Sequence, residues 1–132
     1  MMLVVDASAV AGWLFPDEAG PDLQTLSSHY QIFMAPWLFW VEFRNILVMS
    51  ERRGRLPKGF ADQAIEAVDN LGVILDTDPS NATTLALARR HGLTVYDALY
   101  LELALRKGGD LVTLDKALAK AVRAEGIAIN FP

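Results

Sequence analysis

A chain of 132 residues, 52% of them apolar, is long enough to bury one continuous core, and we expect a single domain over residues 1–132. The absence of cysteine excludes disulfides and thiolate metal sites, so any metal would be held mainly by oxygen. A formal charge of −4 argues against a nucleic-acid binder that relies on a uniformly basic surface.

No segment is typical of a membrane span or a signal peptide. The most apolar run, Ile32–Val41, contains Pro36 and falls well short of the roughly 18 residues that suggest a span. At the N-terminus, Asp6 interrupts the apolar residues before they could form a signal peptide. We therefore expect a cytoplasmic protein with no membrane segment.

The predicted elements, taken in chain order, alternate short apolar strands with helices. In the first part of the chain we expect strands at Leu3–Val5 and Gln31–Met34 and helices at Ala7–Phe15, Asp22–Tyr30 and Pro36–Arg53. In the second part we expect helices at Pro57–Leu71, Ser80–Arg90, Val95–Arg106 and Lys116–Ala124 and strands at Val73–Leu75, Leu111–Leu114 and Ile127–Ile129. This alternation indicates an α/β fold, with a parallel sheet of about five strands and helices on both faces.

Two acids follow predicted strands directly. Asp6 comes after the first strand and Asp115 after the fourth, each where a helix begins. The carboxyl ends of parallel strands share one edge, so both side chains enter one crevice if these strands are neighbours. An alternative for each is a purely structural role, because aspartate is a favoured helix N-cap.

Two further acids lie on helices. Asp97 follows Thr94 at the spacing of a capping box, so it could be a cap, a metal ligand or both. Glu42 stands in a segment with almost no other polar group, and a carboxylate there is unfavourable unless it is paired or bound to a cation. The alternative is a charge that reaches solvent beside Arg44.

Four segments in this order resemble the PIN-domain family, and more specifically the VapC-type toxins of toxin–antitoxin pairs. The segments are Leu3-Val4-Val5-Asp6-Ala7-Ser8, Glu42 followed at three residues by Asn45, Tyr96-Asp97-Ala98-Leu99-Tyr100, and Leu111-Val112-Thr113-Leu114-Asp115. The resemblance covers essentially the whole chain and implies a single PIN-like domain.

The resemblance implies a metal-dependent ribonuclease whose metal-binding acids are Asp6, Glu42, Asp97 and Asp115. Mg²⁺ or Mn²⁺ suits such oxygen ligands, and one or two ions would activate a water for in-line attack on phosphorus. We expect Asp6 and Asp97 to be primary ligands, Asp115 a direct or water-mediated ligand, and Glu42 an outer ligand or a positioner of water.

Two hydroxyl residues near these acids have open roles. Thr113 matches a hydroxyl position that is often found before the last acid of the family, but strand propensity explains it equally well. For Ser8 we favour a helix cap over a role beside the metal.

The family also implies partners, namely an RNA substrate, a small antitoxin that covers the active site, and a second copy in a homodimer. The basic residues near Arg52, Arg53 and Arg55 are as typical of a solvated helix end as of an RNA-binding patch. Trp13 and the aromatic residues from Trp37 to Phe43 could form a groove for a partner helix or belong to the core.

Two alternative functions come from other classes. The first is a phosphoacceptor receiver-like signalling domain, since such folds also gather acids at strand ends, although here Asp76 follows the third strand in what looks like a loop. The second is a non-catalytic PIN-like module that binds RNA or protein.

Overall fold

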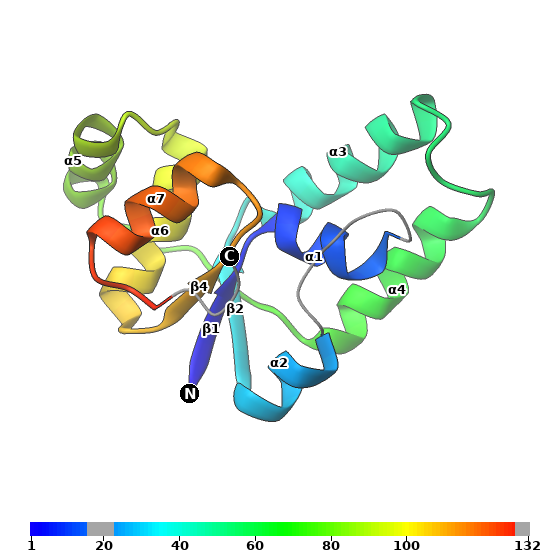
Figure 1. Cartoon of the computed structure of the whole chain (residues 1–132), viewed down its shortest axis with the longest axis horizontal. Coiled ribbons are helices and arrows are strands. Elements are labelled where there is room, and N and C mark those ends of the chain that lie inside the picture. Colours follow the sequence, from blue (N-terminus) through cyan, green and yellow to red (C-terminus); the bar gives the residue numbers. More distant parts are fainter. Residues whose placement is uncertain (16–22, 129–132) are drawn as a thin grey trace.

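The computed structural model describes residues 1–15 and 23–128, in which short parallel strands alternate with helices (Figure 1). The strands are β1 (Met2–Val5), β2 (Ile32–Pro36), β3 (Ile74–Asp76) and β4 (Asp110–Val112). The helices are α1 (Ala7–Leu14), α2 (Leu23–His29), α3 (Phe39–Arg52), α4 (Phe60–Leu71), α5 (Asn81–His91), α6 (Val95–Lys107) and α7 (Lys116–Ala124). The predicted α/β fold is confirmed.

The sheet has the strand order β3-β2-β1-β4, and every pair is parallel. β1 lies inside the sheet, with Val4 opposite both Met34 of β2 and Leu111 of β4. Three of its four residues, Leu3, Val4 and Val5, are fully buried, as expected for a strand covered on both faces. The strand order reverses beside β1, so the carboxyl ends of β1 and β4 form the topological switch point where ligands bind in open α/β sheets.

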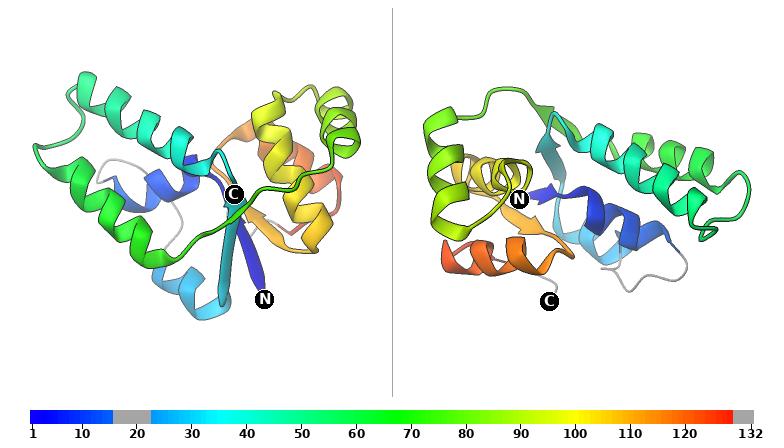
Figure 2. Two further views of the ribbon diagram at one scale, coloured as in Figure 1. Left: turned by 180° about the vertical axis from the view of Figure 1, so that it is seen from behind. Right: turned by 90° about the horizontal axis from the view of Figure 1, so that it is seen from above.

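Helices cover the sheet on both sides. Helices α1, α3 and α4 lie on one side, and α5, α6 and α7 lie on the other, in both the front and back views (Figures 1 and 2). Within the described ranges, no helix is long and apolar enough to cross a bilayer.

A close approach of two backbones allows β4 to start beside β1. Gly108 ends α6 with φ +67°, a left-handed conformation that glycine adopts easily. A Cβ on Gly109 would lie 2.8 Å from Cε and 3.1 Å from the carbonyl oxygen of Met2. Glycine at this position therefore lets β4 pair with β1, which brings the ends of the two strands together.

The sheet has four strands rather than about five, so the expected strand Ile127–Ile129 is a correction. Ile127 and Ala128 are not in a strand, although the amide of Leu111 donates to the carbonyl oxygen of Ala128 over 3.4 Å. Ile129 lies outside the described residues, as does Asp22, with which we had begun the second helix. Ile127 and Ala128 thus share one backbone hydrogen bond with β4 and do not form a strand beside it.

Two prolines do not start helices as we had expected. Pro36 ends β2, opposite Asp76 of β3, and the following amide, that of Trp37, donates to the carbonyl oxygen of Asp76. Proline suits this position because its fixed φ is compatible with extended backbone at a strand end. After Pro57 the chain forms a turn, and α4 begins only at Phe60 because Gly59 has φ +82°, which is outside helical geometry.

The aromatic residues of α3 belong mostly to the core. Phe39 and Phe43 are fully buried and stack with ring centroids 6.0 Å apart, and Trp40 packs edge-on against both. Only Trp37, just before the helix, is largely exposed, at 53%. This stripe anchors α3 in the core, where the helix packs against α1, and so sets the position of Glu42.

Candidate active site

Asp6 is fixed at the junction of β1 and α1. It is the N-cap of α1, and its Oδ1 accepts hydrogen bonds from the amide of Ala9 at 2.9 Å and the hydroxyl of Ser8 at 2.7 Å. Its Oδ2 accepts a bond from the hydroxyl of Thr113. The residue is 5% exposed. The capping role that we considered as an alternative for Asp6 is therefore present, and it leaves the carboxylate at the edge where β1 and β4 end.

Thr113 and Ser8 join the ends of these two strands. The Thr113 oxygen that donates to Asp6 also accepts from the amide of Asp115 at 3.0 Å, and the hydroxyl of Ser8 accepts from the amide of Leu114 at 3.2 Å. Our expectation that Ser8 is a helix cap is wrong, because Asp6 occupies that position. Both hydroxyls instead hold the loop after β4 against the start of α1.

Asp115 and Asp97 each lie at the start of a helix. Asp115 is the N-cap of α7, and its Oδ1 accepts from the amide of Leu118 at 2.8 Å. Asp97 lies in the first turn of α6, whose N-cap Thr94 accepts from the Asp97 amide at 3.2 Å. The capping role that we left open for Asp115 is therefore present. At the start of α6, Thr94 caps the helix by accepting from the Asp97 amide, which is one of the two hydrogen bonds of a capping box.

Glu42 projects from the first turn of α3, across the crevice from α6. Its Oε1 accepts a hydrogen bond of 2.7 Å from the hydroxyl of Tyr100, which lies one turn after Asp97 on α6 and is almost fully buried. Sequence reasoning missed Tyr100, although its spacing of three residues from Asp97 was a signal that the two could share a helix face.

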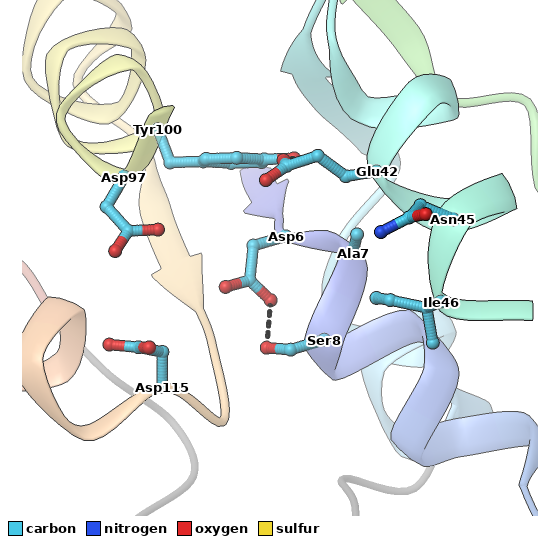
Figure 3. Close-up of a pocket in the computed structure, with 9 residues that line it drawn as sticks. All are labelled: Asp6, Ala7, Ser8, Glu42, Asn45, Ile46, Asp97, Tyr100 and Asp115. Atoms are coloured by element: carbon cyan, nitrogen blue, oxygen red, sulfur yellow. Dashed lines mark hydrogen bonds between the residues drawn. The ribbon is translucent and has the colours of Figure 1, made fainter. Parts of the chain in front are cut away.

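All four predicted acids line one cavity of about 250 Å³, which we call the acid pocket. Figure 3 shows Asp97 and Asp115 on one side, the α3 residues on the other and Asp6 between them. The acid pocket is lined by Asp6, Ala7, Ser8, Glu42, Asn45, Ile46, Asp97, Tyr100 and Asp115. Four separate segments of the chain thus place their acids around one space, and no lysine, arginine or histidine is among these lining residues.

Burial and neighbouring carboxylates raise the pKa values of Asp6, Glu42 and Asp97. Burial raises the pKa of Asp6 to about 6, with a further contribution from Glu42, although its three hydrogen bonds act in the opposite direction. The pKa of Glu42 is raised by burial and by Asp97, and that of Asp97 by burial and by Asp115. Gathering these carboxylates is therefore unfavourable for the isolated chain, and raised pKa values of this kind cluster at functional sites.

The donor set fits a hard divalent cation that keeps part of its water shell. In the described ranges, no three Asp, Glu or His side chains have the arrangement of a preformed metal centre. The acid pocket offers only oxygen ligands, however, and Mg²⁺ usually keeps several waters and binds through one or two carboxylates. Asp6, Asp97 and Asp115 are the candidates to hold such an ion, and Glu42 lies on the side of the acid pocket opposite Asp97 and Asp115.

Comparison with known proteins gives a consistent result. The family model described as PIN domain matches residues 3–124. A relative named Ribonuclease VapC3, from Pyrobaculum aerophilum, is 39% identical over 124 residues, covering 91% of this chain and 94% of the relative.

Two solved structures share the fold. The crystal structure of PAE2754 from Pyrobaculum aerophilum superposes with a TM-score of 0.75 at 27% identity, covering 98% of this chain and 92% of that one. FitAcB from Neisseria gonorrhoeae superposes with a TM-score of 0.66 at 16% identity, covering 97% and 96%. The second likeness, at this identity, concerns the fold alone.

Proposed function

This chain belongs to the PIN-domain family, and from that premise we propose that it is a divalent-metal-dependent endoribonuclease, the toxin of a VapC-type toxin–antitoxin pair. The observation that carries the proposal is that four acids, from four segments of the chain, line one cavity whose lining includes no basic side chain. The relative named Ribonuclease VapC3 supports RNA as the substrate. The resemblance of the motifs supports the toxin role.

The metal would be Mg²⁺ or Mn²⁺, held by Asp6, Asp97 and Asp115. When bound, it would offset the negative charge of the acids, attract the RNA phosphate and lower the pKa of a water molecule. Asp6 contributes a carboxylate whose orientation is fixed by hydrogen bonds from Ser8, Ala9 and Thr113. A fixed ligand of this kind needs little reorganisation when the site is filled.

Glu42 would orient the water that attacks phosphorus. The Tyr100 hydroxyl donates to Oε1 of Glu42 and leaves Oε2 available. Because the pKa of Glu42 is raised, Glu42 is a better proton acceptor than an ordinary glutamate. No histidine or cysteine lines the acid pocket, so among its lining residues the carboxylates are the groups suited to this role.

The receiver-like alternative loses its main support. Asp76, the last residue of β3, lies outside the acid pocket, and its two oxygens accept hydrogen bonds of 3.2 and 2.6 Å from Arg106. Arg106 also pairs with the buried Glu102 at 2.8 Å, so Asp76 belongs to a structural ion-pair network. The non-catalytic alternative is decided by the cleavage experiment below.

The test is RNA cleavage by the purified chain with Mg²⁺ or Mn²⁺. We expect activity that disappears with EDTA and in Asp6→Asn, which keeps the size of the side chain but removes its charge. The matched control is Asp62→Asn, the same change at an exposed position on α4, which should cleave normally. Absence of cleavage by the wild-type chain, or cleavage that survives both EDTA and Asp6→Asn, would reject the proposal.

The antitoxin, the homodimer and the cytoplasmic location remain predictions from the family resemblance and the sequence. One feature supports a protein that covers the acid pocket. Val41, beside Glu42, and Tyr96, beside Asp97, are 60% and 62% exposed, which is unusual for residues of this size. Such side chains next to the catalytic acids would be covered when a partner binds over the cavity.

A further inference from the structure

One amide side chain, that of Asn45, lines the acid pocket among the carboxylates. It lies on α3 three residues after Glu42, so the two side chains share one face of the helix. Three residues advance a helix by about 4.5 Å, which keeps the amide close to the Glu42 carboxylate. Figure 3 shows both side chains projecting from α3 towards the middle of the acid pocket, on the side opposite Asp97 and Asp115.

Asn45 also carries a hydrogen-bond donor that the protein leaves unused. With the acids ionised, the lining side chains with a donor are Ser8, Asn45 and Tyr100. The hydroxyl of Ser8 donates to Asp6, and the hydroxyl of Tyr100 donates to Glu42. The carboxamide of Asn45 makes no hydrogen bond to another residue in the part of the chain that the structure describes. Its N–H groups are therefore free to bind a ligand in the acid pocket.

Helix stability does not account for asparagine at this position. Asparagine is a weaker helix former than alanine and is favoured at caps, whereas Asn45 lies inside α3, which spans Phe39–Arg52. The residue is exposed, so it fills no space in the core. Replacement by alanine should therefore leave the fold intact, and any effect of that change on cleavage would report on the site.

A phosphate in the acid pocket would need a donor on the side of α3. Asp97 and Asp115, with the metal proposed for them, lie on the other side of the cavity. On the α3 side the phosphate would face Glu42, whose carboxylate only accepts hydrogen bonds and repels an anion. The negative charge of a phosphoryl group in the transition state is spread over its non-bridging oxygens. A neutral N–H group beside Glu42 would stabilise the oxygen on that side.

We propose that Asn45 is a catalytic residue, whose side-chain N–H donates to the non-bridging phosphate oxygen that faces α3. The inference rests on the proposed ribonuclease function. In that reaction water adds to phosphorus and loses a proton to Glu42, while the bond to the leaving oxygen breaks and that oxygen takes a proton from solvent. Asn45 neither gains nor loses a proton, and it acts as the donors of an oxyanion hole do.

The first experiment compares cleavage of a short single-stranded RNA in Mn²⁺ by the wild type and three variants. Asn45→Ala removes the carboxamide, and Asn45→Asp keeps the size of the side chain but replaces the donor by a charged acceptor. We expect kcat to fall about a hundredfold in Asn45→Ala, as for the loss of one oxyanion-hole donor, and at least as far in Asn45→Asp. Asn70→Ala, the same change at an exposed position on α4, is the control and should cleave like the wild type.

Two further measurements distinguish a catalytic donor from a metal ligand or a structural residue. Calorimetric titration of the metal-free proteins with Mn²⁺ should give the same affinity for Asn45→Ala as for the wild type. The melting temperature of Asn45→Ala should not be lower than that of the wild type, because alanine is the better helix former.

Sulfur substitution tests which atom Asn45 contacts. In an RNA with one cleaved linkage, each non-bridging oxygen of that linkage is replaced in turn by sulfur, a weaker hydrogen-bond acceptor. Relative to unmodified RNA, we expect the wild type to cleave the isomer with sulfur facing α3 about tenfold more slowly, as for one lost hydrogen bond to a charged group. Asn45→Ala has no such bond to lose, so its rates on this isomer and on unmodified RNA should agree within about twofold.

Four results would each overturn the role of Asn45 alone, provided that the wild type cleaves RNA. They are a kcat of Asn45→Ala within about twofold of the wild type, full activity in Asn45→Asp, weaker Mn²⁺ binding by Asn45→Ala, and equal effects of sulfur in Asn45→Ala and the wild type. If the wild type does not cleave RNA, the proposed function fails and this inference with it.

Discussion

At the scale of single residues, Asp6 is both well anchored and electrostatically unfavourable. Three hydrogen bonds hold its carboxylate, yet burial still raises its pKa to about 6. A charge buried in this way destabilises the metal-free protein, and such local instability is characteristic of residues retained for function. Asp6 therefore allows function and stability to be separated experimentally.

Asp6→Asn should stabilise the chain in EDTA. The folded state raises the pKa of Asp6 from 3.8 to about 6, so folding favours the protonated form, and wild-type stability should fall as the pH rises through this interval. The rise of about two pKa units, at about 1.4 kcal/mol each, corresponds to on the order of 3 kcal/mol at pH 8, which Asn should add to the stability because it has no charge to bury. Urea denaturation across pH measures this difference. A variant less stable than the wild type at pH 8, with the same pH profile, would contradict it.

Tyr100→Phe tests the contact that positions Glu42. The change removes the hydroxyl that donates to Oε1 of Glu42, a hydrogen bond to a charged group that is worth on the order of 2 kcal/mol. We expect a comparable loss of stability, and a cleavage rate between about tenfold and a hundredfold lower because Glu42 is no longer held. Tyr96→Phe, at a 62% exposed position one turn earlier, is the control and should change neither quantity. If Tyr100→Phe cleaved RNA as fast as the wild type, the hydrogen bond from Tyr100 to Glu42 would not be needed for cleavage.

At the scale of elements, four helices begin at the acid pocket. Asp6 and Asp115 cap α1 and α7, whereas Glu42 and Asp97 lie in the first turns of α3 and α6. The N-terminus of a helix carries partial positive charge, which partly offsets the mutual repulsion of carboxylates gathered there. Capping and a role in the site are therefore compatible, because the same helix start that uses a carboxylate also directs it into the cavity.

The start of α6 permits the two roles to be separated. Thr94→Ala removes the side chain that accepts from the Asp97 amide, and should lower stability by about 1 kcal/mol with little loss of cleavage. Asp97→Asn keeps the helix start and removes the charge, so cleavage should be lost while the fold survives. Thermal melting and RNA cleavage, measured on both variants, give the comparison. A large stability loss with normal activity in Asp97→Asn would mean that Asp97 serves only as a cap.

At the scale of the whole molecule, the parts of the fold set by local patterns were predictable from the sequence. Hydrophobic periodicity located the strands and helices, and the rule that carboxyl ends share one edge placed Asp6 beside Asp115. The ends of elements were less predictable where proline or glycine allowed more than one conformation. Pro36, for example, ends a strand although its sequence context also suits a helix start.

Contacts between distant segments were not predictable, because they depend on packing that no local pattern records. The Tyr100 hydroxyl meets Glu42 only because α6 and α3 face each other across the crevice. Ser8 resembled a helix cap, and its bond to the amide of Leu114 depends on the loop after β4. Arg55 resembled a solvated helix end, whereas it lines a cavity next to the acids.

The claim that joins all three scales is that the acid pocket binds a divalent cation. The most direct test is calorimetric titration of the metal-free protein with Mn²⁺, comparing the wild type with Asp97→Asn and with Asp62→Asn as the matched control. We predict that the wild type and Asp62→Asn bind Mn²⁺ equally and that Asp97→Asn binds at least about tenfold more weakly, a difference of 1.4 kcal/mol. No binding by the wild type, or equal binding by all three proteins, would contradict the assignment of the metal to the acid pocket.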